Sequence, residues 1–256
     1  MKSFEELIAE AESWRMEGWN FAPFGDRWVE HLPPWDYRER IASRLPGANS
    51  LLDLGTGGGE FLSSLSPLPE RTIATEGYAS NVPVARDRLR QLKVDVVQTL
   101  CDGNDKVPQL GSLPFKDSSI NLVTNRHESF VASEVFRVLR PSGIFITQQV
   151  GGTDMHELSE LFGFDDDLPE SWNLEVAVRQ LESVGFEVLD ERKAEPISVF
   201  KDIGAVVMFL KITPYQVPGF SIEKYRGRLK ELDGLIRVQG GLNVTESRFL
   251  VEAARP

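Results

Sequence analysis

The stretch LLDLGTGGGEFL, from Leu51 to Leu62, decides the fold of this chain. Two apolar residues lead to Asp53, four glycines then crowd into a turn at positions 55, 57, 58 and 59, and a helix-like pattern follows. Glycines at this density predict that something lies directly against the backbone, because a side chain would prevent the approach. The order strand, turn, helix predicts the start of an alternating α/β fold.

The alternation continues along the chain. Strands are predicted at 50–54, 71–76, 95–101, 120–125, 144–150, 186–191 and 245–253. Helices are predicted at 4–16, 82–92, 133–139 and 173–185. Strands and helices that alternate at this spacing predict a mostly parallel, doubly wound sheet. At 256 residues the chain has the size of one α/β domain with a small cap.

Two segments are additions to that core. Residues 1–35 form an N-terminal arm with four of the five tryptophans, and residues 197–236 form a cap in which we favour a helix over the apolar run IGAVVMFL. The aromatic residues of the arm either hold it on the core, which is slightly favoured, or form one wall of a substrate pocket. We expect both additions to shape an apolar acceptor pocket.

Composition restricts the location and the partners. The N-terminus lacks the apolar core of a signal peptide, and the longest apolar run is too short to span a bilayer. The single cysteine, Cys101, permits no intrachain disulfide and fits a cytoplasmic protein. The formal net charge of -11 argues against a broad basic surface for nucleic acid. The three histidines have no metal-ligand spacing, so no metal is expected.

Glycine fingerprints for phosphate ligands do not fit the turn. The dinucleotide pattern G-x-G-x-x-G, begun at Gly55, would need glycine where Glu60 stands, and that carboxylate would repel a pyrophosphate. The Walker pattern fails because no Gly-Lys-Ser/Thr follows. The pattern that does fit, Asp-x-Gly-x-Gly-x-Gly, resembles the first motif of class I S-adenosylmethionine (SAM)-dependent methyltransferases. The resemblance gives cofactor-binding roles to Asp53, Gly55, Thr56, Gly57 and Gly59.

Two further marks support the resemblance. Glu76 ends the second strand, about twenty residues past the turn, where an acid can accept both ribose hydroxyls. The segments LPFKDSSINLV (113–123) and VFRVLRPSGIFI (135–146) look like the methyltransferase 11 type, with Asn121 and Ser142 as mild departures. The resemblance implies SAM as cofactor and a seven-stranded sheet of order 3-2-1-4-5-7-6 with its last strand antiparallel. It places the methyltransferase domain at 36–256.

The resemblance also implies the remaining site residues. Gly77 joins Glu76 at the ribose, and Asn125 lines the cofactor floor. Asp102 follows the third strand near the adenine, although Gln109 or Leu110 could serve instead.

The candidate for catalysis follows the fourth strand. His127 lies at the sheet edge where ligands bind, and a neutral imidazole there could take a proton from the acceptor. The alternative is a histidine that only packs on the loop. Arg126 and Glu128 are lesser candidates for substrate contacts. The stretch lacks the Pro-Pro-aromatic sequence found in enzymes that methylate adenine N6 or protein glutamine.

The sequence therefore predicts SAM-dependent methyl transfer to a small-molecule oxygen or nitrogen nucleophile. Two alternatives remain open. An RNA methyltransferase would show a local basic rim beside the site, and a non-catalytic SAM-binding protein would share the fold without turnover.

Overall fold

The computed structural model describes residues 2–16, 21–99, 112–164 and 172–256. Its contacts divide the chain into two compact units. The sheet unit comprises Trp35–Gly151, Trp172–Lys193 and Phe249–Pro256. The helical unit comprises Met1–Pro34, Gly152–Ser171 and Ala194–Arg248, so the whole predicted cap and all of the predicted arm except Trp35 fall in the same unit.

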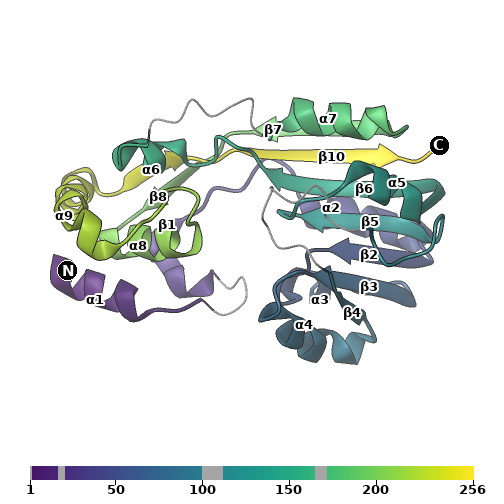
Figure 1. Ribbon diagram of the computed structural model, residues 1–256, viewed down its shortest axis with the longest axis horizontal. Helices are drawn as coiled ribbons and strands as arrows, with labels where there is room; N and C mark the ends of the chain where they lie inside the picture. Colours follow the sequence, from purple (N-terminus) through teal and green to yellow (C-terminus); the bar gives the residue numbers. More distant parts are fainter. Residues whose placement is uncertain (1, 17–20, 100–111, 165–171) are drawn as a thin grey trace. The chain divides into compact units, whose positions relative to one another are not determined.

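The sheet unit is built on a seven-stranded sheet of order β4-β3-β2-β5-β6-β10-β7. Its strands are β2 (Ser50–Leu54), β3 (Arg71–Glu76), β4 (Asp95–Gln98), β5 (Ile120–Arg126), β6 (Leu139–Val150), β7 (Glu187–Ala194) and β10 (Arg248–Ala254). One strand is antiparallel, and Figure 1 shows β10 running against its neighbours. This confirms the predicted fold class and strand order.

The parallel register brings the predicted site residues to one edge. Asp53 of β2 pairs with Ala74 of β3, and Leu54 pairs with Asn125 of β5. Because parallel strands end at the same edge, the glycine turn, Glu76 and the segment after β5 converge there.

Helices cover both faces of this sheet. The helices are α2 (Tyr37–Arg44), α3 (Glu60–Ser63), α4 (Asn81–Leu89), α5 (Ala132–Val138) and α7 (Leu174–Ser183), with short 3-10 turns η2 (Leu45–Gly47) and η3 (Arg90–Leu92). Successive strand residues enter opposite cores: Leu51 packs with residues of α2, α3 and α4, whereas Leu52 packs with residues of α5 and α7. Burial on both faces explains why these strands are continuously apolar.

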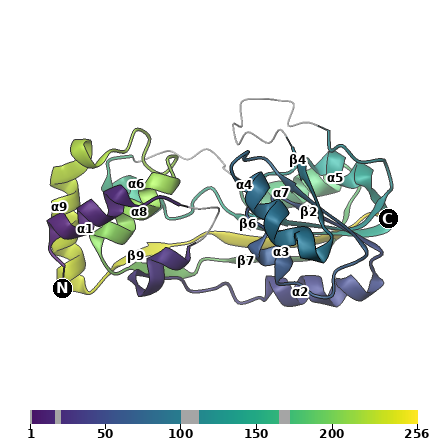
Figure 2. The same ribbon diagram turned by 90° about the horizontal axis from the view of Figure 1, so that it is seen from below.

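In its described residues, the helical unit joins four α-helices to a small antiparallel sheet. The helices are α1 (Phe4–Ser13), α6 (His156–Leu161), α8 (Ile203–Ile212) and α9 (Ile222–Gln239). The sheet has the order β1 (Trp28–Val29), β8 (Ile197–Phe200), β9 (Leu242–Thr245). Figures 1 and 2 both show α1 beside α8 and α9. Residues 203–210 of α8 are all buried, which is why its apolar run has no amphipathic period.

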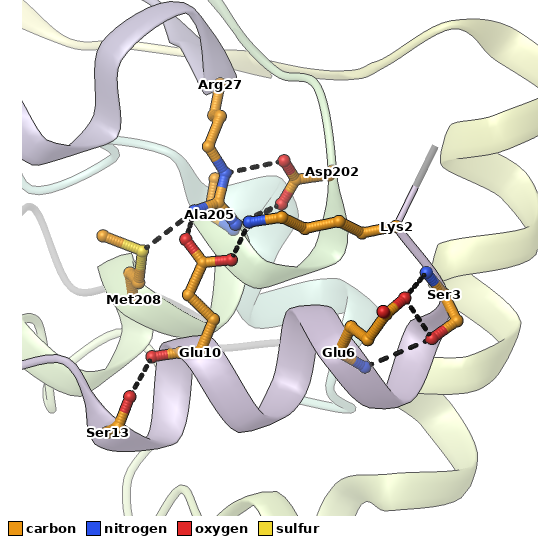
Figure 3. Close-up of polar contacts among 9 residues, drawn as sticks. All are labelled: Lys2, Ser3, Glu6, Glu10, Ser13, Arg27, Asp202, Ala205 and Met208. Carbon is orange, nitrogen blue, oxygen red and sulfur yellow. Dashed lines mark hydrogen bonds and ion pairs between the residues drawn. The ribbon is translucent and has the colours of Figure 1, made fainter.

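An ion-pair cluster joins α1, the 3-10 turn η1 (Ala22–Arg27) and α8 (Figure 3). Asp202 caps α8 by accepting a 2.9 Å hydrogen bond from the Ala205 amide. Both carboxylate oxygens of Asp202 also accept hydrogen bonds from Arg27, each 2.7 Å long. Arg27 donates a third bond of 3.0 Å to Glu10 of α1. One arginine thus neutralises the cap of a buried helix and ties the arm to it.

The aromatic arm packs in the core of the helical unit. Trp28 stacks on Phe200, with ring centroids 5.7 Å apart, and makes an edge contact with Phe24 at 5.3 Å. Trp14 also makes an edge contact with Phe24, with ring centroids 5.6 Å apart. These rings bury a large apolar area, which is the packing role that aromatic residues most often have.

The prediction of one continuous last strand over residues 245–253 was wrong. The chain forms β9 in the small sheet and β10 in the large sheet, with a break at Glu246 and Ser247. Likewise Ile197–Phe200, at the start of the predicted helical cap, is the strand β8. A sequence pattern shows that residues are extended, but the partner strand depends on distant parts of the chain. Within the described ranges, no helix has both the length and the hydropathy needed to cross a membrane.

A buried charge cluster occupies the break between β9 and β10. Glu246 Oε2 lies 2.8 Å from Arg248 Nη2 without forming a hydrogen bond to it, and Arg248 also contacts Asp154. Burial raises the pKa of Glu246 from 4.5 to about 7, against the opposing charge of Arg248. The carboxylates of Glu30 and Asp154 raise it further.

We expect this cluster to make stability fall as pH rises. Between pH 4.5 and about 7 the folded chain keeps a proton on Glu246 that the unfolded chain has released. The free energy of unfolding should therefore decrease across that window by on the order of 1–3 kcal/mol. Glu246→Gln should remove this contribution. Urea unfolding at pH 5 and pH 7.5 checks it, and equal pH dependence in both proteins would contradict the assignment.

Candidate functional site

The glycine turn needs three left-handed residues. Gly55, Gly57 and Gly59 have φ angles of 69°, 61° and 81°, a region that side chains disfavour. The Thr56 amide donates a 2.8 Å hydrogen bond to the Thr75 carbonyl of β3, and the Gly59 amide donates to the Thr56 carbonyl at 3.0 Å. Gly59 begins α3. The turn is thus held against β3, and its glycines carry no side chains of their own.

Asp53 lies buried below this turn. It pairs in register with Thr124 of β5, whose hydroxyl donates a 2.7 Å hydrogen bond to Asp53 Oδ1. Burial raises the pKa of Asp53 to about 6, while Thr124, Thr56 and the charge of Arg126 oppose the rise. The carboxyl group is therefore mostly ionised at neutral pH and would be stabilised further by a cationic ligand.

Glu76 ends β3 with only 2% of its surface exposed. The Tyr78 amide donates a 2.7 Å hydrogen bond to Glu76 Oε1. Burial raises the pKa of Glu76, whereas hydrogen bonds from the backbone of Tyr78, Gly57 and Gly77 and from the Asn81 side chain oppose the rise. The carboxylate consequently links the glycine turn to the loop after β3.

Asn125 is fully buried at the end of β5. Its Oδ1 accepts hydrogen bonds from Thr147, at 2.9 Å, and from Gln149. Its Nδ2 has no hydrogen-bond partner among the described residues. A buried amide donor without a partner is costly, which suits a position that a ligand completes.

His127 follows β5 in an exposed, left-handed conformation with φ of 58°. Its amide donates to the Gln148 carbonyl at 2.8 Å. Trp35 donates its indole N–H to Gln148 Oε1 at 2.8 Å, so the Gln148 amide nitrogen faces His127 Nε2 at 3.1 Å. Because an amide nitrogen only donates, His127 Nε2 must accept, and its neutral ring carries the proton on Nδ1.

Glu128 lies directly over the turn. A Cβ atom placed on Gly55 would be 2.5 Å from Glu128 Cβ and 2.9 Å from Oε2. Ser129 donates hydrogen bonds to Glu128 Oε1 from its amide, at 3.1 Å, and from its hydroxyl, at 3.2 Å. Burial raises the pKa of Glu128, and the charge of Glu76 raises it further. The sequence had suggested only a substrate contact here.

A cavity opens beside these groups at the carboxyl ends of β2, β3 and β5. Its lining includes Gly55, Gly77, Thr99, Glu128 and Phe130. The structure therefore gathers most of the predicted cofactor residues at this edge: Asp53, Gly55, Thr56, Gly57, Gly59, Glu76, Gly77 and Asn125. Asp102, Gln109 and Leu110 lie outside the described residues.

Sequence reasoning missed the polar residues that support this edge. Gln148 and Gln149 end the buried strand β6, and Gln149 Nε2 donates to the Glu128 carbonyl at 3.0 Å. Two adjacent amides at the end of an apolar strand were the available signal. In the described part of the chain, no three His, Cys, Asp or Glu side chains gather as metal ligands do.

The residues at this edge fit a phosphate-free ligand with hydroxyl groups and positive charge. Three carboxyl groups contact the glycine turn: Asp53 bonds with Thr56, Glu76 accepts from Gly57, and the Glu128 side chain packs against Gly55 so closely that a Cβ there would clash with it. None of the described residues that line the cavity is a lysine or arginine, so it does not suit a pyrophosphate.

Comparison with known proteins agrees with this geometry. Residues 52–147 match the family model of a methyltransferase domain. A putative methyltransferase from Bacillus halodurans has a TM-score of 0.55 and 18% identity, covering 86% of this chain and 97% of that one. A functionally unknown protein from Deinococcus radiodurans gives 0.54 and 17%, covering 98% and 100%.

A third structure comes from the complex between the Haloferax volcanii Trm112 methyltransferase activator and a putative methyltransferase. It gives a TM-score of 0.50 and 17% identity, covering 99% of this chain and 96% of that one. At these identities the structures show a shared fold. No curated protein matches the sequence.

Proposed function

We propose that the chain transfers the methyl group of SAM to a small-molecule oxygen or nitrogen nucleophile. Residues 52–147 match the family model of a methyltransferase domain, and the seven-stranded sheet has the strand order of the class I, Rossmann-like type. The family match and the strand order identify an enzyme with SAM as cofactor. The small-molecule acceptor is our inference from charge and from the composition of the site.

The observation that carries the cofactor site is Glu76 beside the glycine turn. Its buried carboxylate is oriented by amides on both sides, so it can accept the two ribose hydroxyls without reorganising. In this proposal Gly55, Gly57 and Gly59 admit the ligand to the backbone, and Asp53 supports the cationic methionine end. When bound, the cofactor supplies a methyl group already activated on a sulfonium, so the chain mainly has to position the acceptor.

The first test is direct binding. Isothermal titration calorimetry should detect stoichiometric binding of both SAM and S-adenosylhomocysteine (SAH) by the full chain. Thermal unfolding should shift upward with either ligand, because a ligand that binds only the folded state stabilises it. Failure to bind either compound would overturn the proposed cofactor site.

We expect RNA not to be the acceptor. The net charge of -11 opposes the phosphate neutralisation that RNA binding requires, so binding to mixed RNA should be undetectable or very weak at physiological salt. Filter binding at two salt concentrations measures this, with a basic RNA-binding protein as positive control. A submicromolar, steeply salt-dependent affinity would favour the RNA alternative.

We propose that His127 acts on the acceptor, and the Gln148 hydrogen bond decides how. Since Nε2 already accepts from Gln148, we expect a neutral ring that can donate from Nδ1 but must break the Gln148 bond to act as a base. Long-range ¹⁵N–¹H NMR should show the Nδ1–H tautomer, and Gln148→Leu should abolish that preference. An Nε2–H tautomer in the parent protein would refute this arrangement.

A role of residues 1–35 and 197–236 in selecting the acceptor stays a prediction, as does a cytoplasmic location. The apolar and aromatic composition of the two segments was the reason to expect a flat or hydrophobic acceptor. In the structure Phe24, Trp28 and residues 203–210 pack within the helical unit itself, so this composition is explained by packing. Substrate profiling with labelled SAM tests this, and selective turnover of small, strongly polar acceptors would argue against it.

A further inference from the structure

Glu128 differs in its charge environment from the other acid that lines the cavity. Glu134 also lines it, but Glu134 lies 2.7 Å from Arg137, which lowers the pKa of Glu134 and compensates its charge. Glu128 forms no ion pair with any described residue. The groups of Ser129 that donate hydrogen bonds to it, an amide and a hydroxyl, are both neutral. When ionised, Glu128 therefore places in the cavity a negative charge that no described cation pairs with.

The carboxylate of Glu128 lies next to the glycine turn. The Glu128 side chain packs against Gly55, with Oε2 2.9 Å from where a Cβ of Gly55 would be, and both residues line the cavity, so the carboxylate lies beside the proposed cofactor site. The Glu128 carbonyl is held by Gln149 at 3.0 Å, and Gln149 is itself bonded to Asn125. The residue is thus anchored by the end of β6 while its carboxylate faces the cavity.

Glu128 and Glu76 act on each other electrostatically. The charge of Glu76 adds to burial in raising the pKa of Glu128. Two carboxylates that repel one another in a partly buried site are stabilised by a cation placed between or beside them. A neutral ligand of the same shape gives no such stabilisation.

Methyl transfer removes a positive charge from the cofactor. SAM carries a sulfonium, and the product SAH carries an uncharged thioether in its place. We propose that Glu128 makes the site select the cationic cofactor SAM over its neutral product SAH, so that the attraction is lost when the methyl group leaves. This inference rests on the proposed function and deepens it, because it assigns charge selectivity to one residue of the cofactor site.

The experiment compares two ligands in matched variants. Calorimetry gives Kd for SAM and SAH in the parent protein, in Glu128→Gln and in Glu60→Gln. Glu60 is a suitable control because its substitution changes the net charge equally, next to the same turn, while its side chain is exposed and paired with Arg88. The ratio Kd(SAH)/Kd(SAM) should fall about tenfold in Glu128→Gln, the scale of one charge interaction at short range in a partly buried site. It should stay unchanged in Glu60→Gln.

Each result has a defined meaning. If Glu128→Gln weakens SAM and SAH equally, or weakens neither, the charge-selective role of Glu128 is wrong even though the cofactor site stands. If the parent protein binds neither ligand, the proposed function itself fails. Glu128→Asp keeps the charge and should retain a preference for SAM, which separates loss of charge from loss of packing. Thermal unfolding verifies that each variant is folded.

Discussion

Gly57→Val should abolish the binding of SAM and leave the fold in place. This is the largest effect that we expect. Gly57 has a φ angle of 61°, and its amide donates to the Glu76 carboxylate. Valine is strained in this conformation, and its branched side chain would stand where the ligand approaches the backbone. The affinity should fall by at least about a hundredfold. The corresponding loss of binding free energy is larger than the roughly 1–2 kcal/mol that backbone strain alone would cost.

A second glycine provides the control for strain. Gly219 in the helical unit has a φ angle of 69° and open space where its Cβ would be. Gly219→Val should lower the thermal unfolding temperature by a similar amount but leave the calorimetric affinity for SAM unchanged. If Gly57→Val binds SAM with the affinity of the parent protein, the motif has been assigned wrongly.

The second large effect is expected at Glu76. Glu76→Ala should weaken SAM binding by roughly 1.5–3 kcal/mol, the scale of hydrogen bonds to a charged group. Part of this loss would come from the turn, because the carboxylate also holds the amides of Gly57, Gly77 and Tyr78. Glu76→Gln keeps the shape and one acceptor oxygen, so its loss should be smaller.

Calorimetry on Glu76→Ala, Glu76→Gln and the parent protein measures these differences. The affinity for adenosine, which has the ribose but lacks the methionine end, should decrease with that for SAM. Unchanged affinities in Glu76→Ala would exclude the ribose role. A loss for SAM without a loss for adenosine would place Glu76 at the methionine end instead.

Local features of the sequence determined the fold class, and they predicted most of the residues of the proposed cofactor site. The glycine turn could be recognised because few residue types other than glycine tolerate a left-handed backbone. Gly55, Gly57 and Gly59 all have positive φ angles. Strands buried on both faces, such as residues 50–54, are continuously apolar, so their positions and alternation with helices could be read directly. Glu76 could be placed because an acid directly after a parallel strand falls at the ligand edge of the sheet.

Only the tertiary structure decided which distant groups meet. Glu128 covers Gly55, Trp35 and Gln148 set the tautomer of His127, and the single strand predicted at 245–253 divides between two sheets. Each of these outcomes depends on strand register and on packing between segments far apart in the chain. Sequence patterns report the local backbone and the buried face of an element. They do not report which side chain lies opposite, and that partner determines the charge, tautomer and strain of a site.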